Sequence, residues 1–431
     1  MKRRDFIQDS AVAIAGSLAS KPWAKRSSSL DKLQIAVIGC YGMGWSNTSS
    51  MLAMDDVDLV AICDVDQRVI DRRLEEYKEY RSNIPKTYID YRKLLLDDSI
   101  DAVIIGTPDH WHCLPMVDAV RAGKHVYVEK PIANTIEECQ LMKAAAKKYN
   151  RVVQVGQGQR SGPHYADAIE VVRSGILGTI RLVKVWAYQG WMKPVEVIPN
   201  APIPEGVDYE RWLGPAPRRP FNRNRFHFSF RWFWDYAGGL MTDWGVHEID
   251  IALYAMNAIA PISVMASGGK LAYPNDASET PDTLQTVFEY DGFNMLWEHA
   301  TGIDNGNYGR TEGIAFIGNN GTLVCNRQGY EIIPEKGGME AATYEKPKDV
   351  DYLKLHTQNF AAAIRANDIT MLNTPIESGS VAAINAQMGN IAYKTGRKVY
   401  WDQSSKGFIK DQQANDLMKA KYFNGYELPK M

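Results

Sequence analysis

Short apolar runs recur along the first 150 residues of the chain, and a stretch with helical periodicity follows most of them. The runs cover residues 34–39, 57–63, 102–105 and 125–128, and they are apolar on both faces. Strands of this kind lie in parallel sheets with helices on both sides. We therefore predict a Rossmann-type, doubly wound α/β half with helices ending near residue 54 and covering 91–96, 115–122 and 135–149.

In the rest of the chain, hydrophobic and polar positions alternate over longer stretches. Short turns such as Asp291-Gly292 separate some of these stretches, which favours an α+β half with a large, open, antiparallel or mixed sheet. A Pro-, Arg- and Asn-rich stretch at residues 190–230 is expected to form a long loop on the substrate side. The predicted strands cover residues 180–188, 262–268, 283–290, 294–299, 313–317 and 322–326.

These patterns divide the chain into three predicted parts: a leader and linker over residues 1–30, a nucleotide-binding domain over 31–150, and a substrate-binding domain over 151–431. The 431 residues are 45% hydrophobic and 23% charged, with a net charge of −2, so nothing steers the protein to nucleic acid. The five cysteines lack the spacing of a metal site, and this usage favours folding in a reducing compartment.

Three glycines follow the first apolar run and turn the chain into a helix. Gly39, Gly42 and Gly44 allow a tight turn and a close approach to a pyrophosphate at the helix N-terminus. The next apolar run ends at Asp64, whose carboxylate can accept hydrogen bonds from the ribose of adenosine. This order of elements predicts a dinucleotide site. NAD is favoured over NADP because Val65, which is not basic, follows the acid.

The glycine pattern departs from the usual fingerprint at one position. Tyr41 stands where that fingerprint has its second glycine, so either Gly42 takes this role or the pyrophosphate binds slightly differently. Tyr41 and Met43 lie in the same turn, and both are expected to contact the cofactor.

Two further loops follow strands of the same predicted sheet. Because ligands bind outside the carboxyl ends of parallel strands, these loops should face the crevice that the glycine turn faces. The two histidines of the first loop could suggest a metal pair, but no further ligand lies nearby, and we predict no metal site. The expected cofactor contacts in the two loops are Thr107, Pro108, His110, His112, Glu129 and Lys130.

Lys130 stands between a carboxylate and a proline, at the end of the apolar run that begins at His125. A lysine is strongly hydrated, so a strand end that faces a cleft is an unusual place for one. There it can be partly desolvated and used in proton transfer. The alternative is a solvated pair with Glu129, which would contribute little. We predict that Lys130 is catalytic.

A helix is predicted over residues 239–256. It would place Asp243, His247 and Asp250 on one face, at positions i, i+4 and i+7. A carboxylate beside a histidine can fix its tautomer and raise its basicity, as general acid–base catalysis requires. The alternatives are a polar helix face, a capped core histidine, or a zinc pair that lacks a third ligand.

The chain is rich in aromatic residues, with 11 Trp and 22 Tyr, and several cluster after residue 185. Aromatic rings in a cleft often stack on sugar rings. Trp232, Phe233 and Trp234, just before the predicted helix, are therefore candidates for a substrate wall, although core packing is equally compatible with at least one of them.

Together these motifs resemble the glucose-fructose oxidoreductase / inositol dehydrogenase (Gfo/Idh/MocA) family, over nearly the whole chain after residue 31. The resemblance implies hydride transfer between NAD and a CH–OH group of a sugar, glycoside or cyclitol. Lys130 and His247 would lie near the reacting carbon with Asp243 beside them, and either could take the hydroxyl proton. The motifs are the glycine turn, Asp64, Gly106-Thr-Pro-Asp-His110, Glu129-Lys-Pro131, Gly238-Gly239, Asp243-x-x-x-His247 and residues 389–398.

The resemblance also implies roles for residues outside these motifs. Pro131 would follow a cis peptide, Gln157 would lie near the cofactor, and Arg160 would lie near the substrate. The sheet of the second domain would build the interface of a homodimer or homotetramer.

The N-terminus carries a close twin-arginine motif, Lys2-Arg-Arg-Asp-Phe-Ile-Gln8, followed by a short apolar run over residues 11–19. This run is too short to span a bilayer as a mature helix, so we predict a signal peptide cleaved near Ser17-Leu-Ala19. A basic tail beside an apolar stretch is the alternative. Because the twin-arginine route moves folded proteins, we expect a periplasmic or other extracytoplasmic protein with no membrane span in its mature form.

Export restricts the chemistry, because free NAD is scarce outside the cytoplasm. The cofactor would have to be held tightly and regenerated within the cycle or by another acceptor. Three functions remain: the preferred sugar oxidoreductase, an NAD-recycling glycosidase that oxidises, eliminates and re-reduces, and a non-catalytic sugar- or nucleotide-binding protein.

Overall fold

The computed structural model describes residues 32–431 of the chain. The twin-arginine motif and its expected cleavage site lie outside these residues. Within the described part, no helix combines the length and the apolar character that crossing a membrane would require.

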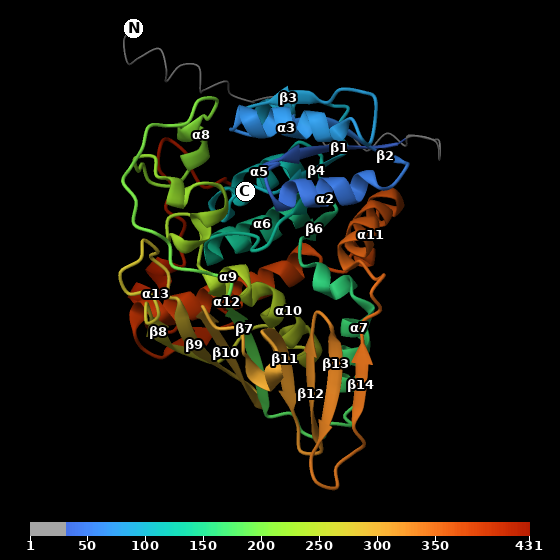
Figure 1. Ribbon diagram of the computed structural model, residues 1–431, viewed down its shortest axis with the longest axis vertical. Helices are drawn as coiled ribbons and strands as arrows, with labels where there is room; N and C mark the ends of the chain where they lie inside the picture. Colours follow the sequence, from blue (N-terminus) through green and yellow to red (C-terminus); the bar gives the residue numbers. More distant parts are fainter. Residues whose placement is uncertain (1–31) are drawn as a thin grey trace. The chain divides into compact units, whose positions relative to one another are not determined.

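Six parallel strands form the first sheet, in the order β3-β2-β1-β4-β5-β6 (Figure 1). This is the order of a doubly wound sheet whose two halves diverge between β1 and β4, and it confirms the fold predicted for this part. The strands are β1 Leu33–Ile38, β2 Val57–Cys63, β3 Lys86–Tyr88, β4 Ala102–Ile105, β5 His125–Val128 and β6 Val153–Val155.

The helices of this half lie between its strands. The sequence pattern missed α3 and β3, because α3 is mostly charged and β3 is a short, largely exposed strand. Strand β6 pairs with β5 beyond the boundary expected at residue 150, so the first sheet extends slightly further along the chain. The helices are α2 Met43–Leu52, α3 Gln67–Tyr77, α4 Tyr91–Leu94, α5 Cys113–Arg121 and α6 Ile136–Tyr149.

The second sheet has ten strands, in the order β14-β13-β12-β11-β7-β10-β9-β8-β15-β16. It is mixed, because β7 and β10 run parallel while the other neighbours are antiparallel. All six strands predicted here are present, and the turn at Gly292 joins β9 to β10. The strands are β7 Leu182–Gln189, β8 Ser263–Gly269, β9 Thr283–Tyr290, β10 Phe293–Thr301, β11 Glu312–Ile317, β12 Gly321–Asn326, β13 Gly329–Pro334, β14 Ala342–Glu345, β15 Val399–Asp402 and β16 Gly407–Phe408.

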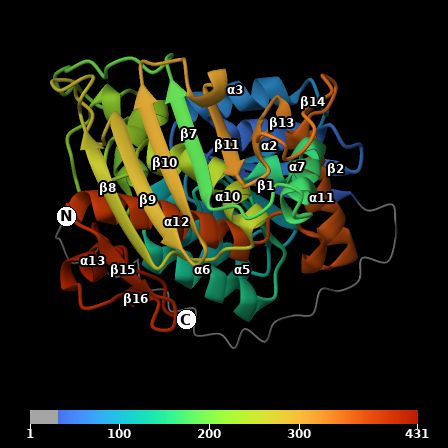
Figure 2. The same ribbon diagram turned by 90° about the horizontal axis from the view of Figure 1, so that it is seen from below.

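Helices pack on one face of this sheet, and Figure 2 looks onto the other face with α10 and α12 behind the strands. Helix α12 is shared between the two halves: Ala382 and Ala386 join the core of the second sheet, whereas Ile376 and Ala383 join that of the first. The remaining helices are α7 Pro163–Arg173, α8 Tyr209–Leu213, α9 Leu240–Asp243, α10 Gly245–Met256, α11 Tyr352–Ala366, α12 Ile376–Thr395 and α13 Gln412–Leu417.

Residues 206–232, which we call the cover segment, run from the second half back onto the first. The backbone of Gln67 donates a hydrogen bond to the carbonyl of Gly206 at 2.8 Å, and that of Asp208 donates to the carbonyl of Val65 at 2.8 Å. The segment carries α8 and two 3-10 turns, and otherwise follows the loop that the sequence predicts. It therefore reaches the end of β2, where the predicted nucleotide site lies.

Candidate active site

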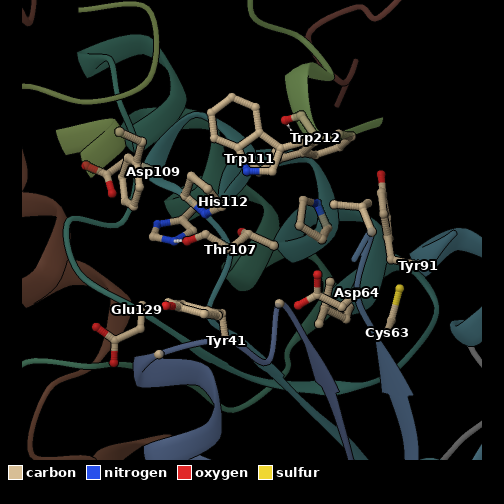
Figure 3. Close-up of a pocket in the computed structure, with 18 of the residues that line it drawn as sticks. Tyr41, Cys63, Asp64, Tyr91, Thr107, Asp109, Trp111, His112, Glu129 and Trp212 are labelled. Carbon is tan, nitrogen blue, oxygen red and sulfur yellow. Dashed lines mark hydrogen bonds between the residues drawn. The ribbon is translucent and has the colours of Figure 1, made fainter. Parts of the chain in front are cut away.

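A cavity of about 1280 Å³, its open mouth included, lies between the carboxyl ends of the first-sheet strands and the cover segment. Figure 3 shows Asp64 and Tyr91 at one end of it and Asp109 and Glu129 at the other. We call these the aromatic end and the charged end. The aromatic end comprises Asp64, Tyr91, Trp111 and Tyr426; the charged end comprises Asp109, Glu129, Lys130, Arg231 and Asp243.

The glycine turn is shaped to receive a phosphate group. Gly39 has φ +79°, and an added Cβ there would lie 2.7 Å from the backbone nitrogen of Thr107. A Cβ on Gly44 would lie 1.9 Å from the carbonyl oxygen of Gly39, whereas a Cβ on Gly42 would meet open space. No side chain caps α2, so its first amides are left for an anion in the cavity. These features fit a dinucleotide pyrophosphate.

The other predicted residues of the turn also line the cavity. Tyr41 and Met43 are both exposed, at 41% and 43%, and both border this space. The ring of Tyr41 stacks on the imidazole of His227 in the cover segment, with ring centroids 4.3 Å apart. Sequence reasoning missed His227, because nothing in the chain's pattern indicates which residue of a long loop returns to the glycine turn.

Asp64 is oriented by the backbone around it. One carboxylate oxygen accepts a hydrogen bond from the backbone nitrogen of Cys40 at 2.9 Å, and the other accepts one from that of Asp66 at 3.1 Å. Burial raises the pKa of the Asp64 carboxyl. Since each oxygen can accept more than one bond, the side chain can still receive ribose hydroxyls.

At the charged end, two cations share one carboxylate oxygen. The Nζ of Lys130 donates to Oδ1 of Asp243 at 2.9 Å and to its carbonyl oxygen at 2.8 Å. The Nε of Arg231 donates to the same Oδ1 at 3.1 Å. Burial alone would raise the pKa of Asp243, but the charges of Lys130 and Arg231 outweigh it and hold that pKa well below its usual range. The peptide bond between Lys130 and Pro131 is cis, as the resemblance implied.

The predicted helix over residues 239–256 is divided at Trp244 into α9 and α10. The carboxylate of Asp243 engages Lys130 and Arg231, and no hydrogen bond joins it to His247 within the described residues. The expected Asp–His pair is therefore absent. The Nδ1 of His247 is buried without a partner. Burial first, and then the charges of Lys130 and Arg327, hold the pKa of His247 well below its usual range, so the imidazole is uncharged at neutral pH.

Asp109 is a cavity residue that sequence reasoning passed over. It is 7% exposed, and burial raises its pKa to about 8, assisted by Asp243 and opposed by Arg231. Its carboxyl is therefore mostly protonated at pH 7. At the same end of the cavity, Glu129 accepts a hydrogen bond from the amide of Asn47 at 2.7 Å, and burial raises its pKa as well. Asp109 lies in the loop after β4, one of the two loops that the sequence places at the crevice, and that position is the signal that could have found it.

The two predicted loop histidines have different positions. His112 lines the cavity, and its two ring nitrogens lie 2.7 Å from the carbonyl oxygens of Thr107 and Pro131, of which the neutral ring can donate to one. His110 does not line it, contrary to the prediction, because its ring packs among aromatic residues and its Nε2 lies 3.2 Å from the carbonyl of Trp212. Burial lowers the pKa of His110 to about 3 and that of His112 to about 4. No cluster of metal-binding side chains occurs among residues 32–431.

The predicted sugar-stacking wall is not at the cavity. Trp234 donates to the carbonyl of Glu279 at 2.9 Å, and Trp232 packs against the buried aromatic cluster of the cover segment without lining the cavity itself. Phe228 and Phe230 of the cover segment line the cavity instead, and the guanidinium of Arg231 lies over both rings.

Two residues placed near the cofactor and substrate by the resemblance also lie outside the cavity lining. Gln157 donates to the carbonyl of Val246 at 3.0 Å. Arg160 makes two hydrogen bonds of 2.7 Å with the carboxylate of Asp250. The charge of Arg160 is therefore already matched by a buried partner, which leaves it poorly suited to hold a substrate.

Two family profiles match the chain and together cover most of it. Residues 33–157 match an oxidoreductase family, NAD-binding Rossmann fold, and residues 166–428 match the α/β C-terminal domain of the same Gfo/Idh/MocA oxidoreductases.

Individual relatives and solved structures are more distant. An α-N-acetylgalactosaminidase of Shewanella oneidensis is 32% identical over 178 residues, 39% of each chain. The chain spans less than half the length of the curated relatives it matches. A levoglucosan dehydrogenase in complex with NADH and levoglucosan superposes with a TM-score of 0.66 at 20% identity, over 86% of this chain and 99% of that one. An aldose–aldose oxidoreductase of Caulobacter crescentus gives 0.63 at 21% identity, with 86% and 99% covered.

Proposed function

The chain belongs to the Gfo/Idh/MocA oxidoreductase family, and from that premise we propose that it oxidises a CH–OH group of a sugar, glycoside or cyclitol with a tightly held NAD. One observation carries the proposal. Lys130, whose ammonium group donates to the carboxylate of Asp243, faces the same cavity as the glycine turn, where helix α2 begins without a side-chain cap. Bound NAD supplies the hydride acceptor at the charged end.

Lys130 is assigned to the reacting oxygen. An ammonium group has three N–H donors, and Asp243 accepts two of them. The third is available to the substrate, where it stabilises the negative charge that develops on oxygen as the carbonyl forms. Arg231 holds the Asp243 carboxylate in place, and is a positioning residue.

Two groups can accept the hydroxyl proton. His247 is uncharged, as the predicted role requires, but it is not among the residues that line the cavity, and its depressed pKa makes it a weak base. Asp109 has a pKa of about 8, close to the working pH that favours proton transfer, and its ionised form is an acceptor. The substrate ring is assigned to Phe228 and Phe230, the aromatic residues that line the cavity beside Arg231.

We assign NAD, and not NADP, to the cavity. A 2′-phosphate would meet the Asp64 carboxylate, and the nearby Arg68 and Arg211 are already paired with Asp66 and Asp208. The twin-arginine motif supports export to the periplasm. The face of the second sheet opposite α10 and α12, which no α-helix among residues 32–431 covers, supports a homodimer or homotetramer.

A second function, an NAD-recycling glycosidase, is supported by the relative named α-N-acetylgalactosaminidase. In that cycle, oxidation of a ring hydroxyl acidifies a neighbouring C–H. Loss of that proton expels the aglycone and leaves an unsaturated ketone. Water then adds across its double bond, and hydride returns from the reduced cofactor to the carbonyl carbon. Both reactions use the same clamped lysine, so the site alone does not favour one over the other.

One experiment separates these functions. The cofactor released from the purified protein is identified by mass spectrometry, and the protein is then offered a panel of aryl glycosides and free sugars. An oxidoreductase yields a keto-sugar in step with reduced cofactor, whereas a glycosidase releases aglycone with no net reduction. Protein that retains dinucleotide and does neither would be a binding protein, and protein that binds no dinucleotide would contradict the proposal.

A further inference from the structure

The C-terminal residues 418–431, which we call the strap, return from the second half to the first. The strap begins after α13 and is anchored on α6. The backbone of Glu137 donates to the carbonyl of Met418 at 3.1 Å, and its carboxylate accepts from the backbone of Ala420 at 2.8 Å. The hydroxyl of Tyr422 donates to the buried carboxylate of Glu138 at 2.7 Å.

The strap then holds the cover segment. The side-chain amide of Asn424 donates to two carbonyls of the cover segment, Gly214 and Ala216, each at 2.8 Å. The backbone of Phe423 donates to the carbonyl of Pro215 between them at 3.0 Å. Three consecutive carbonyls that follow α8 are thus occupied by the strap.

Beyond this contact the strap reaches the cavity. Tyr426 lines the aromatic end. Its ring is nearly perpendicular to that of Trp111, with an interplanar angle of 86° and ring centroids 5.3 Å apart. Trp111 in turn makes an edge contact with Tyr91 at 6.0 Å. Flat apolar walls with exposed edges suit a purine base, because aromatic rings stack on one another or meet edge to face.

The cover segment closes on the same place from the opposite direction. Its Trp212 carbonyl accepts a hydrogen bond from the indole of Trp111 at 2.9 Å. The imidazole of His227 lies 3.0 Å from the carboxylate of Asp66, just past Asp64. The strap therefore fastens a segment that itself spans the cavity.

We propose that the strap completes the cofactor site, with Tyr426 as a wall for the adenine of NAD and Asn424 as the tie that keeps the cover segment closed. The inference rests on the proposed function, since it presumes a bound dinucleotide. It goes further by assigning slow cofactor exchange to the last residues of the chain, which an enzyme working where NAD is scarce would require.

The test measures exchange in the full-length protein loaded with isotopically labelled NAD and chased with unlabelled NAD. Label that stays with the protein after rapid gel filtration is counted by mass spectrometry. Tyr426→Ala should release label at least tenfold faster than the wild type. Tyr426→Phe, which keeps the ring, should stay within twofold.

Asn424 has φ +58°, so Asn424→Gly removes the amide without straining the backbone. We expect it to speed release severalfold. Asn367→Gly is the matched control, because Asn367 also has positive φ at the exposed end of α11, remote from the cavity. Thermal unfolding of each variant verifies that it is folded.

The outcomes separate the two proposals. If the wild type holds NAD but Tyr426→Ala and Asn424→Gly release it at the wild-type rate, the strap has no part in the site and only this inference falls. A wild type that holds no dinucleotide would overturn the proposed function as well. Faster release in Asn367→Gly would also count against the strap, because any loosening would then have the same effect.

Discussion

At the charged end of the cavity, Lys130 from the loop after β5 and Arg231 from the cover segment converge on one carboxylate oxygen of α9, whereas three aromatic rings gather beside Asp64 at the aromatic end. Lys130 and Arg231 both donate to Oδ1 of Asp243. The ring of Trp111 meets those of Tyr91 and Tyr426 edge to face. Both ends draw on parts of the chain that lie far apart in sequence.

The difference separates chemistry from retention. The shared Asp243 carboxylate fixes the position of the Lys130 ammonium group, and a small displacement of that group would lower the reaction rate strongly. Ring contacts are less directional. Their loss should therefore weaken cofactor binding without moving the groups that take part in the reaction. Variants at the charged end should therefore lower turnover with NAD still bound. Variants at the aromatic end should release NAD faster, with little change in turnover at saturating NAD.

The largest expected effect is that of Lys130→Met, which keeps the aliphatic stem and removes the charge. Turnover should fall by a few hundred-fold, since a donor to a developing oxyanion contributes ~3–4 kcal/mol. Retained NAD, measured by mass spectrometry, should be unchanged. Lys124→Met is the control: Lys124 is buried near the other end of β5, where it donates to two backbone carbonyls. Comparable loss of turnover in both variants would contradict the assignment.

Arg231→Gln should have the next largest effect. The carboxylate of Asp243 would keep Lys130 but lose its second cation, and loss of a hydrogen bond to a charged group costs about 2 kcal/mol, or roughly 30-fold in turnover. The matched variant is Arg219→Gln. Arg219 is likewise paired with carboxylates, in its case Asp235 and Glu279, but it lies away from the cavity lining. Steady-state kinetics that cannot distinguish the two variants would remove Arg231 from the site.

Gly214→Ala tests the aromatic end. An added Cβ would lie 2.1 Å from the ring of Trp111, so the cover segment would have to shift. We expect a loss of about 2 kcal/mol in the free energy of unfolding and faster NAD release, with turnover at saturating NAD little changed. Gly123→Ala separates out backbone strain, because Gly123 has φ +80° and open space around it. Equal destabilisation of the two variants would show that the contact with Trp111 is unimportant.

The smallest effect concerns pH. The folded-state pKa of Asp109, about 8, lies above that of the unfolded chain, near 4, so the folded protein binds the proton more tightly between these values. The stability contributed by the protonated carboxyl is complete below about pH 4 and is lost as the pH rises through 8. Asp109→Asn removes this proton. As the pH rises from 6 to 7, the free energy of unfolding of the wild type should therefore fall by about 1 kcal/mol more than that of Asp109→Asn. Parallel denaturation curves would show that Asp109 is ionised at neutral pH.

The two ends also differ in what the sequence could predict. The glycine turn, Asp64 and Lys130 are read from local patterns, because each lies at the end of a buried apolar strand and the topology of a doubly wound sheet brings such ends together. Local sequence patterns were enough to predict four of the six strands of the first sheet and six strands of the second.

The remaining contacts depend on long-range packing. Asp243 was paired with His247 by helical spacing, but the helix breaks at Trp244 and the carboxylate turns to Lys130, which is 113 residues away along the chain. Arg231 and Tyr426 come from irregular segments, in which no period marks the inward face. Trp234 and Arg160 were misplaced for the same reason: residue type indicated a binding role, but neighbouring buried partners had already engaged them.

Helix α12 makes the two halves of the described chain interdependent for folding. Its Ile376 and Ala383 fill the core beneath the first sheet, while Ala382, Ala386 and Ile391 fill that beneath the second. Phe360 of α11 completes another core of the first half. A fragment ending near residue 157 would lack these side chains, and the apolar core residues that they cover would be exposed to water. The nucleotide-binding half should therefore not fold on its own. Residues 32–431 should instead unfold in one cooperative transition, and cofactor bound to one half should protect both.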